Sequence, residues 1–404
     1  MKKRFFFILL LIQFSVFAQI TISGIVADKN GPLEGAAVYF NNTMLGTTTD
    51  VQGKFSIKVR EGIYDLVVSY LGYKKIIYSL NTSNYKKSLV FKLEEEQNTL
   101  DEVIISKTVY NDEWKYNLEV FKREFIGRTE IAAGCKMLNP EVLHFNFDAK
   151  NNVLTAIAKK PLEIKHESLG YKIIYELEDF TINKNMVSYL GYSRYENLKG
   201  SKRKQLQWTK NRLTAYNGSY THFYQTLLKN TTYQEGFIIH QFRRVPNPQR
   251  PSEEAIKKAR EFVKLSKNPI DFSKKIEDPK TTLDSSIVIL RKVNLPKSID
   301  YLYKSSIPSD SIISVKNGVI SLDFENNLSI VYTKEIEEKG YILRNPFSKM
   351  RAPLAQTSSI IPIKIPTILD KNGFMTNPLD VFYEGYWSYE KFGNSLPMDY
   401  DPLE

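Results

Sequence analysis

The chain has 404 residues, of which 42% are hydrophobic, and it carries 56 Lys and Arg against 45 Asp and Glu, a formal charge of +11. Its single cysteine, Cys135, excludes an internal disulfide, and we expect it to be a buried small side chain. The basic balance suits an anionic partner such as lipopolysaccharide, peptidoglycan or an acidic glycan, but it equally suits a merely soluble surface. No nucleic-acid motif accompanies it.

Residues 1–18 have the layout of a secretory signal. Three cations, Lys2 to Arg4, precede an apolar run that ends in a small-residue cleavage site at Ala18. About 13 apolar residues are too few for the roughly 20 that a membrane helix needs. We therefore expect an exported protein, with a retained N-terminal anchor as the alternative. Removal of the signal leaves a charge of 11 − 3 = +8.

Short alternating strands fill residues 19–94. Phe55, Ile57 and Val59 alternate with polar residues, which is typical of a strand with one buried and one wet face. Turn residues, such as the Asn-Gly-Pro sequence at 30–32, separate the strands. Strands of this length with turns at roughly 8–12-residue intervals indicate an antiparallel β-sandwich.

Spaced glycine, aspartate and aromatic positions carry a more specific signal in the same segment. They are Gly24, Val26, Asp28, Gly31, Leu33, Gly35, Ala36, Gly46, Thr47, Thr49, Asp50, Gly53, Phe55, Tyr64 and residues 69–73. This pattern resembles the carboxypeptidase regulatory-like domain, a transthyretin-like sandwich of Bacteroidota surface proteins. In that family the domain often stands at the N-terminus of TonB-dependent receptors of the SusC type. Residues 100–105 look like the segment that closes it, so we expect a linker at 95–110.

The remaining residues, 111–404, are expected to form an α+β body with a possible sub-boundary near 270–280. Trp114, Leu118 and Phe121 define one apolar helix face. Helices are expected at 107–127, from about 211 with an interruption at Gly218, and at 252–267. Strands are expected at 143–147, 153–158, 162–164, 171–177, 180–190, 237–242, 287–290, 312–315, 319–324 and 328–332. A hairpin turn is expected at 326–327, and an edge strand or loop at 359–366. The C-terminal residues 381–387 are expected to dock on the body.

Several positions of the body are similar to those of a Bacteroidota group of about 400 residues. They are Trp114, Phe125, Gly127, Cys135, Asn139, Pro140, Trp208, Arg212, Ala215, Tyr216, Gly218, Ser219, His222, Phe223 and residues 384–387. Members of this group pair the same sandwich with a body of no established activity. The resemblance therefore transfers no catalytic residues.

The histidines argue against a zinc carboxypeptidase. Such an enzyme needs a His-x-x-Glu pair and a distant His, because zinc keeps three protein ligands and an open position. The residues three positions after His144, His166, His222 and His240 are not glutamates. We therefore expect no metal, no cofactor and no catalytic residue that the sequence can name.

One cluster is the best candidate for a binding site: Trp208, Arg212, Tyr216, Ser219 and His222. A helix over this segment would place Ser219 and His222 on one face. They are either a helix cap beside a structural histidine or a polar pair that lines a pocket, and a serine nucleophile is the third interpretation.

The basic run around Trp208 comprises Lys199, Lys202, Arg203, Lys204, Lys210 and Arg212, and is expected to be a solvated loop or an anion-binding face.

The leading hypothesis is an exported, non-enzymatic interaction protein of the periplasm or outer-membrane face. Its sandwich would act as a docking or spacer module, and its body would bind an envelope protein or glycan. One alternative is a hydrolase with a site around Ser219, His222 and Arg212. Another is a small outer-membrane-associated component of a nutrient-uptake system, or a small outer-membrane barrel. A full receptor barrel is not expected, because only 404 − 105 = 299 residues follow the sandwich.

Overall fold

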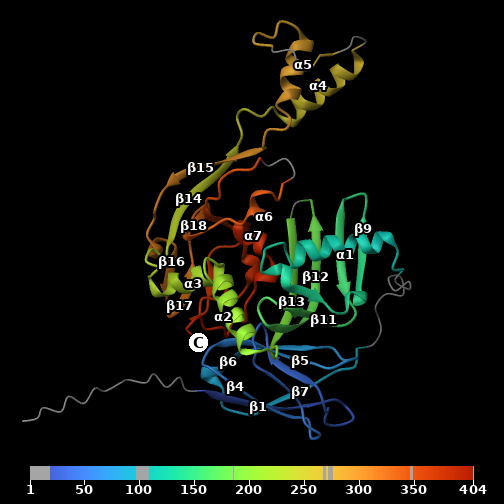
Figure 1. Ribbon diagram of the computed structural model, residues 1–404, viewed down its shortest axis with the longest axis vertical. Helices are drawn as coiled ribbons and strands as arrows, with labels where there is room; N and C mark the ends of the chain where they lie inside the picture. The colour runs from blue at the N-terminus through green and yellow to red at the C-terminus, as the bar shows by residue number, and fades with distance from the viewer. Residues whose placement is uncertain are drawn as a thin grey trace, which may run out of the picture.

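The computed structural model describes residues 19–96, 109–184, 186–266, 270–271, 276–345 and 349–403 (Figure 1). The predicted signal at 1–18 and most of the predicted linker at 95–110 lie outside the described residues. In the part that is described, no helix is long and apolar enough to cross a membrane.

The N-terminal domain is the predicted β-sandwich. One sheet has the order β4-β1-β7 and the other β3-β2-β5-β6, with β1 and β7 parallel. Phe55, Ile57 and Val59 all point into the core between the sheets, as their alternation predicts. The strands are β1 Ile20–Ala27, β2 Ala37–Phe40, β3 Gly46–Thr48, β4 Lys54–Val59, β5 Ile63–Ser69, β6 Ile76–Asn81 and β7 Leu89–Lys92.

The first part of the body is a strongly bent sheet covered on its inner face by α1 (Asp112–Phe125). The long strand β12 pairs with β13 along one edge and with both β11 and β10 along the other. The strands are β8 Cys135–Met137, β9 Leu143–Asp148, β10 Val153–Ala158, β11 Leu162–His166, β12 Tyr171–Asn183 and β13 Met186–Asn197. The predicted break between two strands at 177–180 is instead a bulge inside β12.

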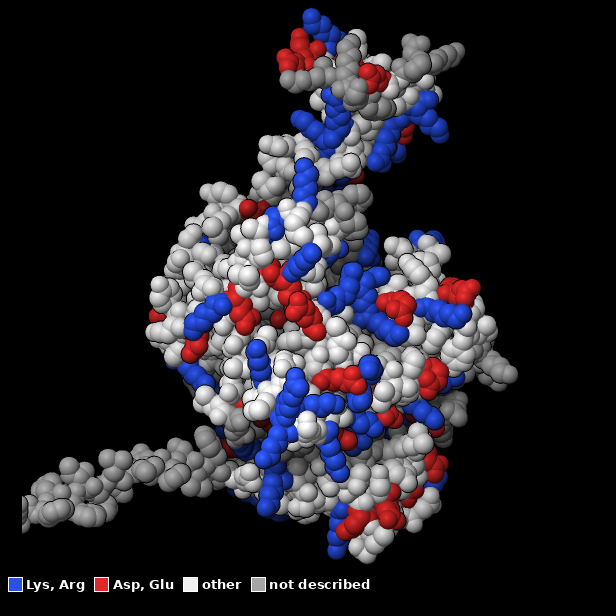
Figure 2. Space-filling model, in the orientation of Figure 1, with Lys and Arg blue, Asp and Glu red and all other residues white. Residues whose placement is uncertain are grey.

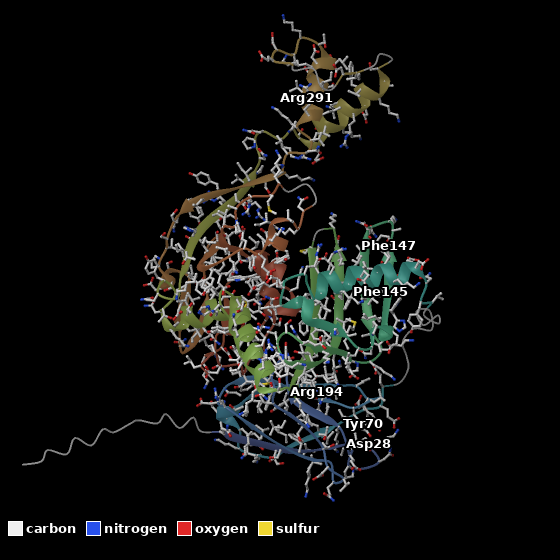
Figure 3. The ribbon with its side chains drawn as sticks, viewed as in Figure 1. Asp28, Tyr70, Phe145, Phe147, Arg194 and Arg291 are labelled. Carbon is white, nitrogen blue, oxygen red and sulfur yellow. The ribbon has the colours of Figure 1, made fainter. Side chains whose placement is uncertain are left out.

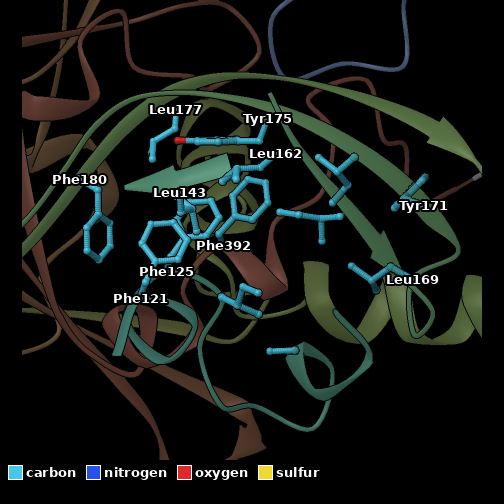
Figure 4. Packing of buried hydrophobic residues seen from close by; sticks show 14 of the residues in the cluster. Phe121, Phe125, Leu143, Leu162, Leu169, Tyr171, Tyr175, Leu177, Phe180 and Phe392 are labelled. Atoms are coloured by element: carbon cyan, nitrogen blue, oxygen red, sulfur yellow. The ribbon is translucent and has the colours of Figure 1, made fainter. Parts of the chain in front are cut away.

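Aromatic side chains fill the space between α1 and this sheet (Figure 4). Phe121 and Phe125 are fully buried on the predicted face of α1. Phe392, from the C-terminal region, stacks on Phe125 with 4.8 Å between ring centres. Cys135 packs at the edge of this core, and burial raises its pKa to about 12, as expected for an unreactive thiol.

The second part of the body has its own core around a five-stranded sheet of order β15-β14-β18-β19-β21, with a small sheet β16-β17-β20 beside it. Helices α2 (Lys202–Tyr216) and α3 (Tyr220–Lys229) precede the sheet, and α7 (Tyr386–Glu390) follows its last strand. The other elements are β14 Phe237–Pro246, β15 Ser298–Lys304, β16 Ile313–Lys316, β17 Val319–Leu322, β18 Asn327–Ile336, α6 Lys339–Ile342, β19 Ala355–Pro362, β20 Thr367–Leu369 and β21 Val381–Gly385.

A helical hairpin, α4 (Glu253–Leu265) and α5 (Thr282–Arg291), projects from the body between two paired strands (Figure 1). The strand predicted at 287–290 is therefore wrong. A capping box between Thr281 and Asp284 starts a helix there, and this outweighs the β-branched run that favoured a strand. The sub-boundary predicted near 270–280 falls within this insertion, whose flanking strands β14 and β15 pair directly.

Three other expectations are corrected. The helix predicted from about 211 begins at Lys202, because Ser201 caps it. The turn at 326–327 does not make a hairpin, since β17 and β18 belong to different sheets. The segment 359–366 is expected at a sheet edge or in a loop, but its first residues belong to β19, which pairs with β18 on one side and β21 on the other.

Candidate functional site

Trp208 and Arg212 hold a turn of the neighbouring sheet. The Trp208 indole Nε1 donates to the Glu167 carbonyl at 2.8 Å, and the Arg212 Nε donates to the Leu169 carbonyl at 2.8 Å. The Arg212 guanidinium also lies 4.0 Å from the Tyr171 ring centre. These contacts engage both side chains inside the protein and give them a structural role.

Ser219 is the N-cap of α3. Its Oγ accepts a hydrogen bond from the His222 backbone N–H at 3.1 Å. The His222 ring accepts from the Gly218 N–H through Nδ1 at 3.2 Å, and burial lowers its pKa to about 4. The capping interpretation is thus confirmed, because the Ser219 hydroxyl is engaged with the backbone of its own helix.

Replacing Ser219 with alanine is expected to lower the free energy of unfolding by about 1 kcal/mol, because the first turn of α3 loses its cap. Ser201→Ala, which removes the cap of α2, is the matched control and is expected to cost a similar amount. Urea unfolding measures both. A serine nucleophile would instead show itself as a turnover that Ser219→Ala alone abolishes.

Tyr216 and Ser219 do line a cavity, but it is too small for a substrate. Its volume is about 40 Å³, which holds a few water molecules. The other lining residues are Ala215, Tyr220, Thr221, Trp387, Glu390, Lys391, Asn394, Ser395, Leu396, Pro397, Met398 and Tyr400. Trp208, Arg212 and His222 do not reach it, so the structure divides the five predicted residues between separate places.

Glu390 is the unusual group of this cavity. It is 8% exposed, and among the described residues its carboxyl group accepts one hydrogen bond, from Asn394 Nδ2 at 3.4 Å. Burial raises the pKa of this carboxyl to about 8, with smaller contributions from Glu335 and Glu338. The next residue, Lys391, has φ 54° and ψ −165°, a conformation that costs a non-glycine residue about 1–3 kcal/mol.

The sandwich is joined to the body by a buried polar network. The Tyr39 hydroxyl donates to Glu176 Oε1 at 2.9 Å, and Lys75 Nζ lies 2.8 Å from Glu176 Oε2. Lys75 also pairs with Glu178. Figure 3 shows Arg194 between the two domains, and its guanidinium lies 5.9 Å from the Tyr39 ring centre. The sandwich therefore covers the part of the outer face of the sheet that carries Glu176.

Backbone hydrogen bonds reinforce this junction. The Asn42 N–H donates to the Ser193 carbonyl at 2.6 Å, and the Tyr195 N–H donates to the Thr43 carbonyl at 2.9 Å. The C-terminal segment closes the same loop, since the Met398 N–H donates to the Asn42 carbonyl at 2.7 Å. This backbone pairing onto the edge strand β13 fixes the orientation of the sandwich relative to the body more strictly than side-chain contacts alone would.

The rest of that outer face carries a row of small polar side chains. Asn146, Thr155, Thr181 and Ser188 stand in register across β9, β10, β12 and β13. Next to them is an open groove of about 540 Å³. It is lined by Asn146, Asp148, Asn151, Val153, Thr155, Asn183 and Lys184.

The groove has a rigid wall and free amides. The Asp148 carboxylate accepts hydrogen bonds from the Lys150 and Asn151 N–H groups at 2.9 and 3.1 Å, which orders the turn between β9 and β10. Within the described part of the chain, no hydrogen bond engages the side-chain amides of Asn146 or Asn183. Both residues are exposed, so these amides are open to a ligand.

Sequence reasoning missed the groove, the junction and Glu390. Tyr39 and Glu176 are 137 positions apart, so no local spacing signals their contact. The period-two alternation of β9 and β10 does carry a signal for the groove, because it places Asn146 and Thr155 on the wet faces. Among the described residues, no group of three or more His, Cys, Asp or Glu side chains could hold a metal ion.

Comparison with known proteins identifies the N-terminal domain. Residues 22–105 match the CarboxypepD_reg-like domain, which confirms the predicted resemblance. The chain is also 44% identical over 57 residues to the TonB-dependent receptor SusC of Bacteroides thetaiotaomicron. That similarity covers 14% of this chain and 6% of the receptor, so the chain spans a small part of that receptor's length.

Proposed function

We propose that this protein is a non-enzymatic binding protein of the cell envelope whose body holds a hydroxyl-rich ligand, a glycan, in the groove beside β9 and β10. The observation that carries the proposal is the row of amide and hydroxyl side chains that borders this groove. The docked sandwich leaves this half of the sheet open and holds it in one orientation relative to the N-terminal domain.

The chemistry of the groove suits such a ligand. Amide and hydroxyl groups both donate and accept, so they match the paired donors and acceptors of sugar hydroxyls. A volume of about 540 Å³ lies within the range of small-molecule sites. The exposed amides of Asn146 and Asn183 need no rearrangement to reach a ligand.

The envelope location rests on two observations. The first 18 residues have the pattern of a secretory signal. The N-terminal domain is similar to a segment of a TonB-dependent receptor. Both support the periplasm or the outer-membrane face, and a place beside a nutrient-uptake system is the finer form of this proposal.

The test is binding of the mature chain to immobilised glycans, including envelope polysaccharide fractions. The double variant Asn146→Ala, Asn183→Ala is expected to weaken binding roughly tenfold or more, because each lost hydrogen bond contributes about 1 kcal/mol. Gln52→Ala with Asn84→Ala removes two exposed amides from the sandwich as the matched control. Equal loss in the control, absence of glycan binding, or cleavage of the bound glycan would contradict the proposal.

A further inference from the structure

Helix α2 presents an unusual solvent face. The helix is almost entirely exposed, and only Trp208, Ala215 and Tyr216 are buried. The opposite face carries Lys202, Arg203, Leu206, Lys210 and Leu213. The other four lie three, four or seven residues from Leu206, so all five share one stripe of the helix surface. We call these five residues the α2 stripe.

The charge of the α2 stripe is uncompensated. No Asp or Glu occurs between Glu196 and Glu235 in the sequence. Among the described residues, Lys202, Arg203 and Lys210 make no ion pair. Lys and Arg side chains accordingly gather over α2 on the molecular face shown in Figure 2. By contrast, the lysines of α4 stand among glutamates, and Lys258 pairs with Glu254 at 2.7 Å.

Two leucines of the same stripe face water. Leu206 is 73% exposed and Leu213 is 42% exposed, although each would be more stable in an apolar environment. A membrane interface offers a partner to both kinds of side chain, because phosphates and acyl chains adjoin there. A soluble polyanion would neutralise the cations but would give the leucines nothing to pack against.

We infer that the α2 stripe docks on a phosphate-bearing lipid surface, with the cations at the headgroups and both leucines inserted among the acyl chains. This inference does not depend on the glycan groove. Contact through α2 would hold the sandwich and body against the membrane without a spanning segment. The attraction is electrostatic in large part, so it weakens as the salt concentration rises.

Sedimentation of the mature chain with vesicles tests the inference. Binding is expected to phosphatidylcholine vesicles that contain phosphatidylglycerol, and not to pure phosphatidylcholine. The triple variant Lys202→Gln, Arg203→Gln, Lys210→Gln is expected to lower partitioning roughly a hundredfold, at about fivefold for each cation. Leu206→Ser with Leu213→Ser is expected to lower it roughly tenfold.

The matched control removes three exposed cations from α4: Lys257→Gln, Arg260→Gln and Lys264→Gln. It changes the net charge equally and is expected to keep near-normal partitioning. Equal loss in this control would show a non-specific charge effect and overturn the inference. Binding to pure phosphatidylcholine, or no binding to any vesicle, would also overturn the inference. A third contrary result would be binding to inorganic polyphosphate that is as strong as binding to vesicles, together with a leucine variant that binds vesicles normally. Circular dichroism confirms that each variant is folded.

Discussion

Replacing Glu176 with glutamine is expected to lower the free energy of unfolding by about 3 kcal/mol, because it removes the charge at the centre of the sandwich–body junction. The side chain is 8% exposed and serves both Tyr39 and Lys75. Burial opposes the charged form of Lys75, and the pKa of this amine is raised by Glu176 first and by Glu178 second. Glutamine fills the same volume but leaves the Lys75 charge only partly compensated.

The control for this variant is Glu178→Gln. Glu178 lies on the same strand and also pairs with Lys75, but its side chain is 35% exposed. Its loss is expected to cost less than about 1 kcal/mol.

Urea unfolding can follow the two domains separately, because all three tryptophans lie in the body. Tryptophan fluorescence reports the body and far-ultraviolet circular dichroism reports the whole chain. In the wild type the two transitions should coincide, and in Glu176→Gln they should separate. Coincident, unshifted transitions in Glu176→Gln would show that the Glu176 charge contributes no stability to the junction.

Replacing Glu390 with glutamine is expected to raise the free energy of unfolding by about 5 kcal/mol at pH 9. The folded-state pKa of Glu390 is about 8, against an ordinary value of 4.5. The folded protein therefore keeps a proton that the unfolded chain releases between these two values. Its stability falls as the pH rises through that window, and the penalty is complete above pH 8.

The buried histidines act in the opposite direction. Burial lowers the pKa of His166 and of His222 to about 4. Each group contributes stability that is lost as the pH falls from about 6.5 through 4. The wild-type protein should accordingly be most stable near pH 6.5, with a decline on both sides.

Thermal or urea unfolding from pH 5 to pH 9 measures this profile. Glu390→Gln should remove the alkaline decline. It should also steepen the acid limb, because the Glu390 window overlaps that limb and opposes the histidines there. Glu119→Gln, at a side chain that is 70% exposed, is the control and should leave both limbs in place. An alkaline decline of unchanged size in Glu390→Gln would show that another group causes it.

The sequence predicts those parts of the fold that depend on residues close together in the chain. The alternation in β4, the apolar face of α1 and the cap at Ser219 were all visible in the sequence and are all confirmed. The strand predicted at 287–290 failed because a run of Ile and Val fits a helix as well as a strand, and the capping box decided between them.

The candidate site was much less predictable. The five side chains proposed from the sequence share one segment but point to different places, since Trp208 and Arg212 serve the turn after β11. The groove depends on a register among β9, β10 and β12 that no short motif encodes. The junction depends on Tyr39 and Glu176, which only the completed fold brings together.

The central claim is that the sandwich and the body form one rigid unit that leaves the groove open. The most direct test is a pulsed electron paramagnetic resonance distance measurement on the mature chain with Cys135→Ala. Spin labels would replace Lys58 on the sandwich and Lys150 beside the groove, which are both exposed. The account predicts one narrow distance distribution that does not change with salt. A broad distribution, as a flexibly tethered sandwich would give, would contradict it.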